Sequence, residues 1–103
     1  MYKIFVFAPV DATDKIIDAA SEAGAGKIGN YSHCAFITSG VGNWKSLPGS
    51  HPTIGEVGKM SREPENKIEM LCSDKSLQNI VTAIRRAHPY ESPEIDVVKL
   101  EQK

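Results

Sequence analysis

The chain has 103 residues, of which 41% are hydrophobic, a size that suits one domain built around one small core. We therefore expect a single domain over residues 1–103. The 12 Lys and Arg residues against 13 Asp and Glu residues leave a formal net charge of −1, which excludes the strongly basic surface needed for nucleic-acid binding or for attachment to an anionic membrane.

The chain begins with a predicted strand followed by a predicted helix. Residues 3–8, with a continuous apolar run from Ile4 to Ala8, are typical of a buried strand, and the Pro9 and Asp11 that follow argue against a signal peptide. Residues 14–23 place apolar side chains at the spacing of one helical face, and Gly24 is a helix stop signal.

The middle of the chain contains two further strands and an unusual density of glycine. Residues 33–38 and 67–72 each read as a strand. All eight glycines lie between Gly24 and Gly58, where turn signals divide the chain into short segments. We interpret this stretch as an elaborated, Gly-rich hairpin inserted between strands two and three.

A second amphipathic helix and a final strand complete the chain. Apolar residues recur at helical spacing between residues 77 and 84, and Arg85 and Arg86 place positive charge in the last turn. Because Pro89 pushes the residue before it away from the α region, the helix should end at or just before His88. Residues 94–101 then follow as a strand.

This order of elements, β-α-β-β-α-β, predicts an α+β protein with the ferredoxin-like arrangement, in which both helices cover one face of the sheet. The first strand has apolar residues on both sides, with Phe5 and Phe7 opposite the side that faces the helices. Either the Gly-rich hairpin or a second copy of the chain would have to cover them. Exposing each ring would cost about 1.5 to 3 kcal/mol, which is large for a small domain, and we favour self-association as a homo-oligomer.

The two cysteines indicate a reducing environment. Cys34 and Cys72 lie in strand-like runs without a CxxC spacing, a pattern that fits two buried thiols better than a disulfide. No segment is long and apolar enough for a transmembrane helix. We therefore expect a cytoplasmic protein that does not associate with membranes.

The run at residues 88–94, His-Pro-Tyr-Glu-Ser-Pro-Glu, resembles the signature of CutA-type divalent-cation tolerance proteins, which share a trimeric PII-like ferredoxin fold. Three further segments, residues 24–36, 40–44 and 49–55, closely resemble the domain inserted into YqfO-like proteins, also called the Nif-three-like or NGG-interacting-factor family. The resemblance spans residues 3–100 and implies a standalone form of this insert that assembles as a homotrimer.

One feature of the YqfO-like family has no counterpart here. Full-length members carry a flanking portion whose His, Asp and Glu residues hold two metal ions, and the chain has no room for that portion. The resemblance therefore assigns no dimetal site to this chain. Similarity to CutA and PII-like proteins implies binding or sensing by analogy of fold alone.

Histidine, cysteine and glutamate residues suggest a divalent metal site, but their spacing selects no single cluster. His33 and Cys34 are neighbours on a predicted strand, so their side chains should point to opposite faces. His51 could meet His88 and Glu91 from the same or an adjacent subunit and bind zinc or copper. In the alternative interpretation, His88 caps the preceding helix and His51 is an ordinary loop residue.

Two aromatic residues are candidates for ligand binding. Tyr90 could line an intersubunit cleft together with His88 and Glu91; alternatively, Tyr90 packs at the edge of the core and Glu91 bonds backbone N–H groups of the turn. Trp44 either anchors the hairpin or, if exposed, marks a surface for a ligand or a protein partner.

The glycine pattern Gly24-x-Gly26-x-x-Gly29 formally matches a dinucleotide-binding fingerprint. It follows a helix and precedes a strand, the reverse of the context in which such a motif binds pyrophosphate, and we reject that interpretation. We expect these glycines to supply positive φ angles and close approach of the backbone. An anion-binding nest of backbone N–H groups is left open.

No motif predicts a catalytic centre, and Glu63, Glu65 and Glu69 read as a solvated, charged strand edge. The sequence therefore predicts a small oligomeric binding or sensing domain that takes a small molecule or divalent metal in clefts between subunits. The alternative is a structural or protein-interaction module that binds a partner protein through the Gly-rich hairpin.

Overall fold

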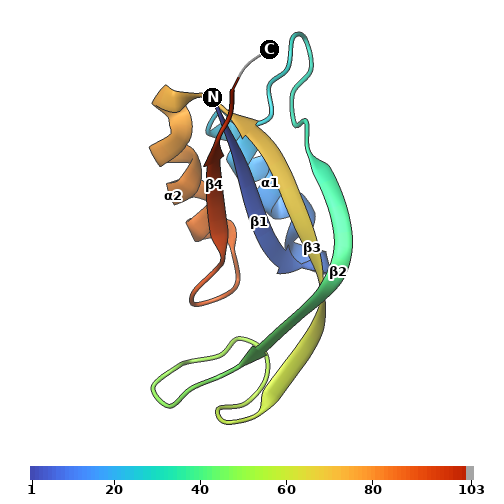
Figure 1. The fold of residues 1–103 in the computed structure, drawn as a ribbon, viewed down its shortest axis with the longest axis vertical. Helices are drawn as coiled ribbons and strands as arrows, with labels where there is room; N and C mark the ends of the chain where they lie inside the picture. The colour runs from blue at the N-terminus through green and yellow to red at the C-terminus, as the bar shows by residue number, and fades with distance from the viewer. Residues whose placement is uncertain (102–103) are drawn as a thin grey trace.

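The computed structural model describes residues 1–101 and shows six regular elements in the order predicted from the sequence (Figure 1). These elements are β1 (Tyr2–Pro9), α1 (Thr13–Glu22), β2 (Phe36–Lys45), β3 (Met60–Cys72), α2 (Leu77–Ala87) and β4 (Ile95–Lys99). Short 3-10 turns at Val10–Ala12 and Asp74–Ser76 lead into the two helices.

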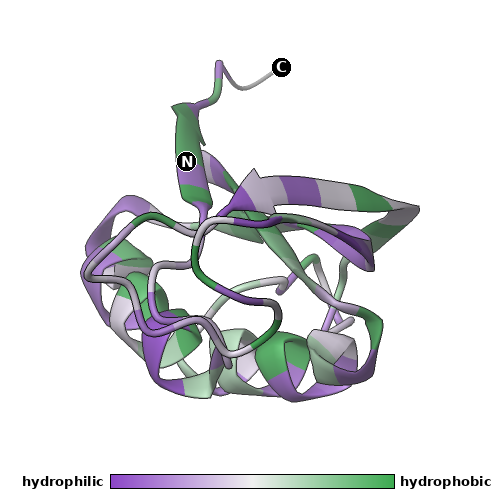
Figure 2. Ribbon diagram, turned by 90° about the horizontal axis from the view of Figure 1, so that it is seen from below, coloured by the Kyte–Doolittle hydropathy of each residue, from purple (hydrophilic) through white to green (hydrophobic). Residues whose placement is uncertain are grey.

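The four strands form one sheet in the order β2-β3-β1-β4, and all neighbouring strands are antiparallel. Both helices lie on the same side of this sheet, which Figure 2 shows as a helical layer beneath the strands. The predicted α+β, ferredoxin-like arrangement is confirmed.

The core fills the space between the sheet and the helices. Alternate residues of β1, among them Ile4 and Val6, are buried as the sequence predicts, and they pack with apolar residues of the helices. The largest fully buried side chains are Ile4, Ile16, Ile68, Ile80, Ile84, Val6 and Cys72. Burial raises the pKa of the Cys72 thiol, with a further contribution from the nearby Asp74 carboxylate, and Cys34 is half-buried rather than buried.

Strands β2 and β3 are much longer than the predicted strands at residues 33–38 and 67–72. Their pairing runs from Phe36 opposite Glu69 to Lys45 opposite Met60, so it continues through glycines that the sequence suggests as breaks. Pro64 is tolerated inside β3 because β1 ends opposite Glu65, which leaves that side of β3 without a neighbouring strand to receive an N–H group. Cross-strand pairing has overridden local propensity here.

Residues before β2 turn rather than extend, so the expectation that His33 and Cys34 lie on a strand is wrong. His33 has a φ of 58°, in the left-handed region that strands do not use. The N–H of Cys34 donates to the Gly26 carbonyl at 2.8 Å, which draws this segment back against the loop after α1.

The glycines of that loop have the role expected for them. Gly24, Gly26 and Gly29 have φ angles of 116°, 72° and 58°, and a Cβ on Gly26 would lie 2.7 Å from the Cys34 carbonyl oxygen. The N–H groups of Gly24, Ala25 and Gly26 all donate to protein carbonyls. These groups therefore do not form the anion nest that the sequence left open.

Residues 46–59 connect β2 to β3 and bend back toward the turn that follows α2 (Figure 1). The N–H of Gly58 donates to the Ser46 carbonyl at 2.7 Å and closes the base of this connection. The Thr53 hydroxyl donates to the Pro89 carbonyl at 2.8 Å. The tip of the hairpin is thereby attached to the turn between α2 and β4.

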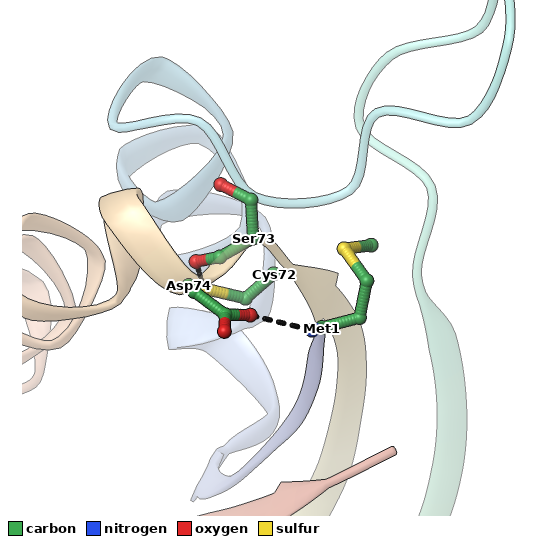
Figure 3. A network of polar contacts seen from close by, with 4 residues as sticks. All are labelled: Met1, Cys72, Ser73 and Asp74. Carbon is green, nitrogen blue, oxygen red and sulfur yellow. Dashed lines mark hydrogen bonds and ion pairs between the residues drawn. The ribbon is translucent and has the colours of Figure 1, made fainter. Parts of the chain in front are cut away.

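A second attachment joins the start of β1 to the start of α2 (Figure 3). The Met1 amino group lies 2.5 Å from Asp74 Oδ1, and this interaction lowers the pKa of the Asp74 carboxyl. Next to it, the Cys72 thiol donates to the Ser73 carbonyl at 3.1 Å. These contacts fix the connection between β3 and the second helix.

The face of the sheet opposite the helices is only partly covered. Phe5 and Phe7 are half-buried, and Lys67 Nζ lies 4.7 Å from the centre of the Phe5 ring. By contrast, Phe36, which shares this face through its pairing with Glu69, is 68% exposed. Within residues 1–101, neither helix is long and apolar enough to span a membrane.

Candidate functional site

A cavity of about 650 Å³ lies where the far end of the β2–β3 hairpin meets the turn after α2. Strands β1, β2 and β3 and the turn itself all contribute to its wall. Its lining residues include Phe7, Trp44, Glu65, Tyr90, Glu91 and Glu94.

His88 builds the turn that carries Tyr90. It is the residue at which α2 ends, with extended backbone angles as the following proline predicts, and its N–H donates to the Ile84 carbonyl at 2.9 Å. Its side chain is buried, with Nδ1 accepting the Tyr90 N–H at 3.0 Å and Nε2 lying 2.8 Å from the Phe7 carbonyl. Since Nδ1 is an acceptor, the proton is on Nε2, and His88 joins the turn to β1 as a neutral imidazole.

Tyr90 is held at both ends. Its hydroxyl donates to Glu65 Oε2 at 2.7 Å, and its ring contacts Trp44 and His88 with ring centres 5.6 Å and 5.0 Å apart. Burial, together with the hydrogen bond to Glu65, raises the pKa of Tyr90 above its usual value. The phenol is therefore a protonated donor at neutral pH, and its ring is fixed in one orientation.

Glu65 reaches Tyr90 because Gly42 has no side chain. A Cβ on Gly42 would lie 2.3 Å from the Glu65 carboxyl carbon, closer than two such atoms can approach. The expectation that Glu65 belongs to a solvated strand edge is wrong, since this carboxylate lines the cavity and accepts the Tyr90 hydroxyl.

His51 and Glu91 come together, but His88 does not join them. Glu91 Oε2 accepts the His51 backbone N–H at 3.0 Å, and Glu91 Oε1 lies 3.9 Å from His51 Nδ1. Both nitrogens of His88 are engaged inside the protein. Among residues 1–101, no group of three or more His, Cys, Asp and Glu side chains is arranged to hold a metal ion.

Carboxylates dominate the charge of the cavity wall. Glu65, Glu91 and Glu94 line it, with Lys45 as the basic lining residue. A hydrogen bond to Asp96, desolvation, and repulsion by the Asp96 and Glu65 carboxylates raise the pKa of Glu94 above its usual value. The cavity wall therefore carries more acidic than basic side chains.

The structure brings Trp44, Tyr90 and Glu91 to one cavity, as part of the predicted site. His51 lies beside Glu91, and His88 lies behind Tyr90 as a buried support. Sequence reasoning did not identify Phe7, Glu65 or Glu94 as lining residues. A signal for Glu65 existed, since a Tyr hydroxyl at the edge of a core needs an acceptor, but only the strand register shows which carboxylate is in reach.

Sequence comparison matches this chain to one part of longer bacterial proteins. It is 40% identical over 100 residues to a GTP cyclohydrolase 1 type 2 homolog of Halalkalibacterium halodurans, covering 97% of this chain and 27% of that protein. The Bacillus subtilis protein of the same name is 37% identical over 100 residues, again with 97% and 27% covered. The chain is homologous to a region of the GTP cyclohydrolase 1 type 2 homologs. It spans about a quarter of the length of these relatives, and no protein-family model matches it.

Solved structures agree with this relationship. The Bacillus cereus protein related to NIF3 superimposes with a TM-score of 0.84 at 35% identity, covering 98% of this chain and 26% of that one. CutA1 from Pyrococcus horikoshii gives a TM-score of 0.72 at 13% identity, with 100% of this chain and 86% of that one covered. The PII-like protein CutA from Nostoc sp. PCC 7120 gives 0.70 at 19% identity, with 98% and 82% covered. The NIF3-related region thus has the CutA/PII-like fold.

Proposed function

We propose that this chain is a small-molecule binding or sensing domain and that its ligand occupies the cavity between the hairpin tip and the turn after α2. The observation that carries this proposal is the convergence of Trp44, Tyr90 and Glu91 on one concave surface. Concave sites with aromatic walls and a few fixed polar groups are where ligands usually bind. Tyr90 is such a fixed group, since its backbone and its hydroxyl are both bonded.

We further propose that the chain assembles as a homotrimer, like the CutA and PII-like proteins that it resembles, with the cavity at the boundary between subunits. The physical support is the edge strand β2, on which Phe36, Ile37 and Val41 are 68%, 45% and 70% exposed. An edge strand offers unpaired backbone groups to another chain. Burying these side chains against a second copy would stabilise the assembly.

A divalent metal such as zinc or copper is the second ligand class for this site. His51 and Glu91 lie close enough to share an ion after a small side-chain movement. Because both His88 nitrogens bond within the subunit, the remaining ligands would have to come from a neighbouring subunit. The small-molecule assignment needs no such rearrangement and is preferred.

The alternative function is a protein-interaction module that uses the connection between β2 and β3. Leu47 and Val57 in this connection are 66% and 47% exposed, which suits contact with a partner protein. This function requires no ligand in the cavity.

A thermal-shift screen combined with light scattering tests these functions. A ligand present at 100 times its dissociation constant should stabilise the folded chain by about 2.7 kcal/mol, and we expect a response from at least one organic metabolite. We also expect scattering to report a mass three times that of the 11.2 kDa chain. A monomer that responds to no metabolite or metal would overturn the binding function and favour the interaction module.

A further inference from the structure

The wall of the cavity has two properties that together restrict its ligand. Glu65, Glu91 and Glu94 give it three carboxylates against the single ammonium group of Lys45. The rings of Trp44, Tyr90 and Phe7 also reach it. An anionic ligand such as a nucleotide would meet repulsion there, whereas a cation would be attracted.

The two larger rings form a corner rather than a flat stack. Trp44 and Tyr90 have ring centres 5.6 Å apart and planes inclined at 53°, and both residues line the cavity. The face of an aromatic ring carries partial negative charge and attracts ammonium groups within about 6 Å of its centre. Both rings belong to the cavity wall, so a cation in the cavity can pack against them.

This corner is held in place before any ligand arrives. Nδ1 of His88 accepts the Tyr90 N–H at 3.0 Å, and the Tyr90 hydroxyl donates to Glu65 at 2.7 Å. The ring therefore cannot turn away without breaking a hydrogen bond. A fixed ring loses little conformational freedom on binding.

Glu94 contributes a negative charge whose repulsion with neighbouring carboxylates a bound cation would reduce. The neighbouring Asp96 and Glu65 carboxylates raise the pKa of Glu94 above the usual value, which shows that negative charge at this position is disfavoured by its surroundings. A positive group near Glu94 would offset this repulsion, so the carboxylates favour a cation in the cavity.

We propose that the cavity binds an organic cation, with an alkylated ammonium group seated against Trp44 and Tyr90 and facing the Glu65 and Glu94 carboxylates. This inference rests on the proposed function, because it names the ligand class of the same site. The volume of about 650 Å³ exceeds that of a single ammonium group, so the cavity has room for a larger molecule that carries one. A divalent metal fits less well, because it requires several oxygen or nitrogen ligands in place of ring faces.

The test uses choline and its neutral analogue dimethylbutanol, in which carbon replaces the charged nitrogen. The two differ in charge and hardly in shape. Trp44 is the only tryptophan in the chain, so its fluorescence reports binding directly, with calorimetry as a second measurement at constant ionic strength. We expect saturable binding of choline and binding of the alcohol that is weaker by about tenfold or more.

Variants locate the site. Glu94→Gln removes one charge and Tyr90→Leu removes one ring face, and each should weaken choline binding by about fivefold to tenfold. Glu22→Gln is the matched control, since Glu22 is an exposed carboxylate at the end of α1 and does not line this cavity. It should leave choline binding unchanged. Circular dichroism checks that every variant folds. If Tyr90→Leu does not fold, the test rests on Glu94→Gln alone.

Each other outcome overturns the cation assignment in a recognisable way. Equal binding of choline and the alcohol would show that the charge of the ligand does not affect its affinity. The proposed binding function would then stand, and the assignment of a cationic ligand would be wrong. Choline binding that neither Glu94→Gln nor Tyr90→Leu weakens would place the cation elsewhere. If choline does not bind while another metabolite stabilises the protein, organic cations are excluded as the ligand class. If choline dissociates the oligomer, the space beside Trp44 and Tyr90 is instead occupied by a basic side chain of a second copy.

Discussion

The Tyr90 hydroxyl donates a 2.7 Å hydrogen bond to Glu65 Oε2, and this bond joins the turn after α2 to a strand 25 residues earlier in the chain. It closes one wall of the cavity and holds the Tyr90 ring beside Trp44. The stability of the molecule and the shape of its candidate site therefore depend on the same contact.

Replacing Tyr90 with Phe removes this hydrogen bond and keeps the ring. We expect the free energy of unfolding to fall by about 1 kcal/mol, the usual value for such a bond, as measured by urea denaturation. Glu65→Gln keeps an acceptor oxygen and should cost less. A Tyr90→Phe variant as stable as the parent would show that the bond contributes nothing to folding.

His88 and His51 should differ strongly in their contribution to stability. His88→Ala leaves the Phe7 carbonyl and the Tyr90 N–H without their partner inside the protein, and we expect a loss of roughly 2–4 kcal/mol. His51 has an 80% exposed side chain, so His51→Ala should change stability by less than about 0.5 kcal/mol. Equal effects of the two substitutions in chemical denaturation would contradict the buried role of His88.

The Gly42→Ala substitution should displace Glu65, because the added methyl group would lie 2.3 Å from its carboxyl carbon. Gly40→Ala is the matched control in the same strand, since nothing lies within 4 Å of its added Cβ. We expect Gly42→Ala alone to destabilise the chain and to lose the Tyr90 hydrogen bond.

A double-mutant cycle identifies the cause of this effect. If Gly42→Ala acts by moving Glu65, its cost should be smaller by about 0.5–1 kcal/mol in a Tyr90→Phe background. Strictly additive costs would mean that the methyl group disturbs the sheet without affecting the Tyr90 contact.

The pH dependence of Glu94 has a defined sign. Its pKa in the folded chain is raised above the ordinary value of 4.5, first by the hydrogen bond to Asp96. Its contribution to stability is therefore complete below the unfolded pKa and is lost as pH rises through the folded pKa. The stability of Glu94→Gln relative to the parent should increase as the pH rises above the ordinary pKa of 4.5, as measured by urea midpoints. A difference that does not change with pH would contradict the coupling to Asp96.

Asp74 should show the opposite sign. The Met1 amino group holds its pKa below the ordinary value of 3.8, so its contribution is present above the unfolded pKa and is lost as pH falls through the folded pKa. The advantage of the parent over Asp74→Asn should therefore shrink in acid. Carboxyl NMR titration provides a direct check, because the Asp74 resonance should titrate below the range of an unperturbed aspartate.

Periodicity and proline chemistry were sufficient to predict the framework of the fold. The alternation in β1 identifies Ile4 and Val6 as core residues, and Pro89 places the end of α2 at His88. These signals are local, so one stretch of sequence carries each of them. The resemblance to the CutA signature and to the YqfO-like insert agrees with the homology and the fold now shown.

The rest of the molecule depends on pairing between distant residues. Gly40 and Gly42 lie inside β2 because β3 pairs with them, although each would weaken a strand in isolation. The position of Glu65 in the cavity follows from that same register and from Gly42. A sequence without its strand register cannot show either relationship.

Strand β3 has 13 residues and β1 has eight, and the difference produces the elongated shape of 46 × 24 × 24 Å. Beyond Glu65, β2 and β3 continue as a two-stranded ribbon, which by itself is barely stable in water. Its tip depends on the Thr53 bond to Pro89 and the His51 bond to Glu91. Amide exchange in this ribbon should therefore slow when the cavity fills, because a ligand that holds the tip against the turn after α2 also restrains the two strands that carry the tip.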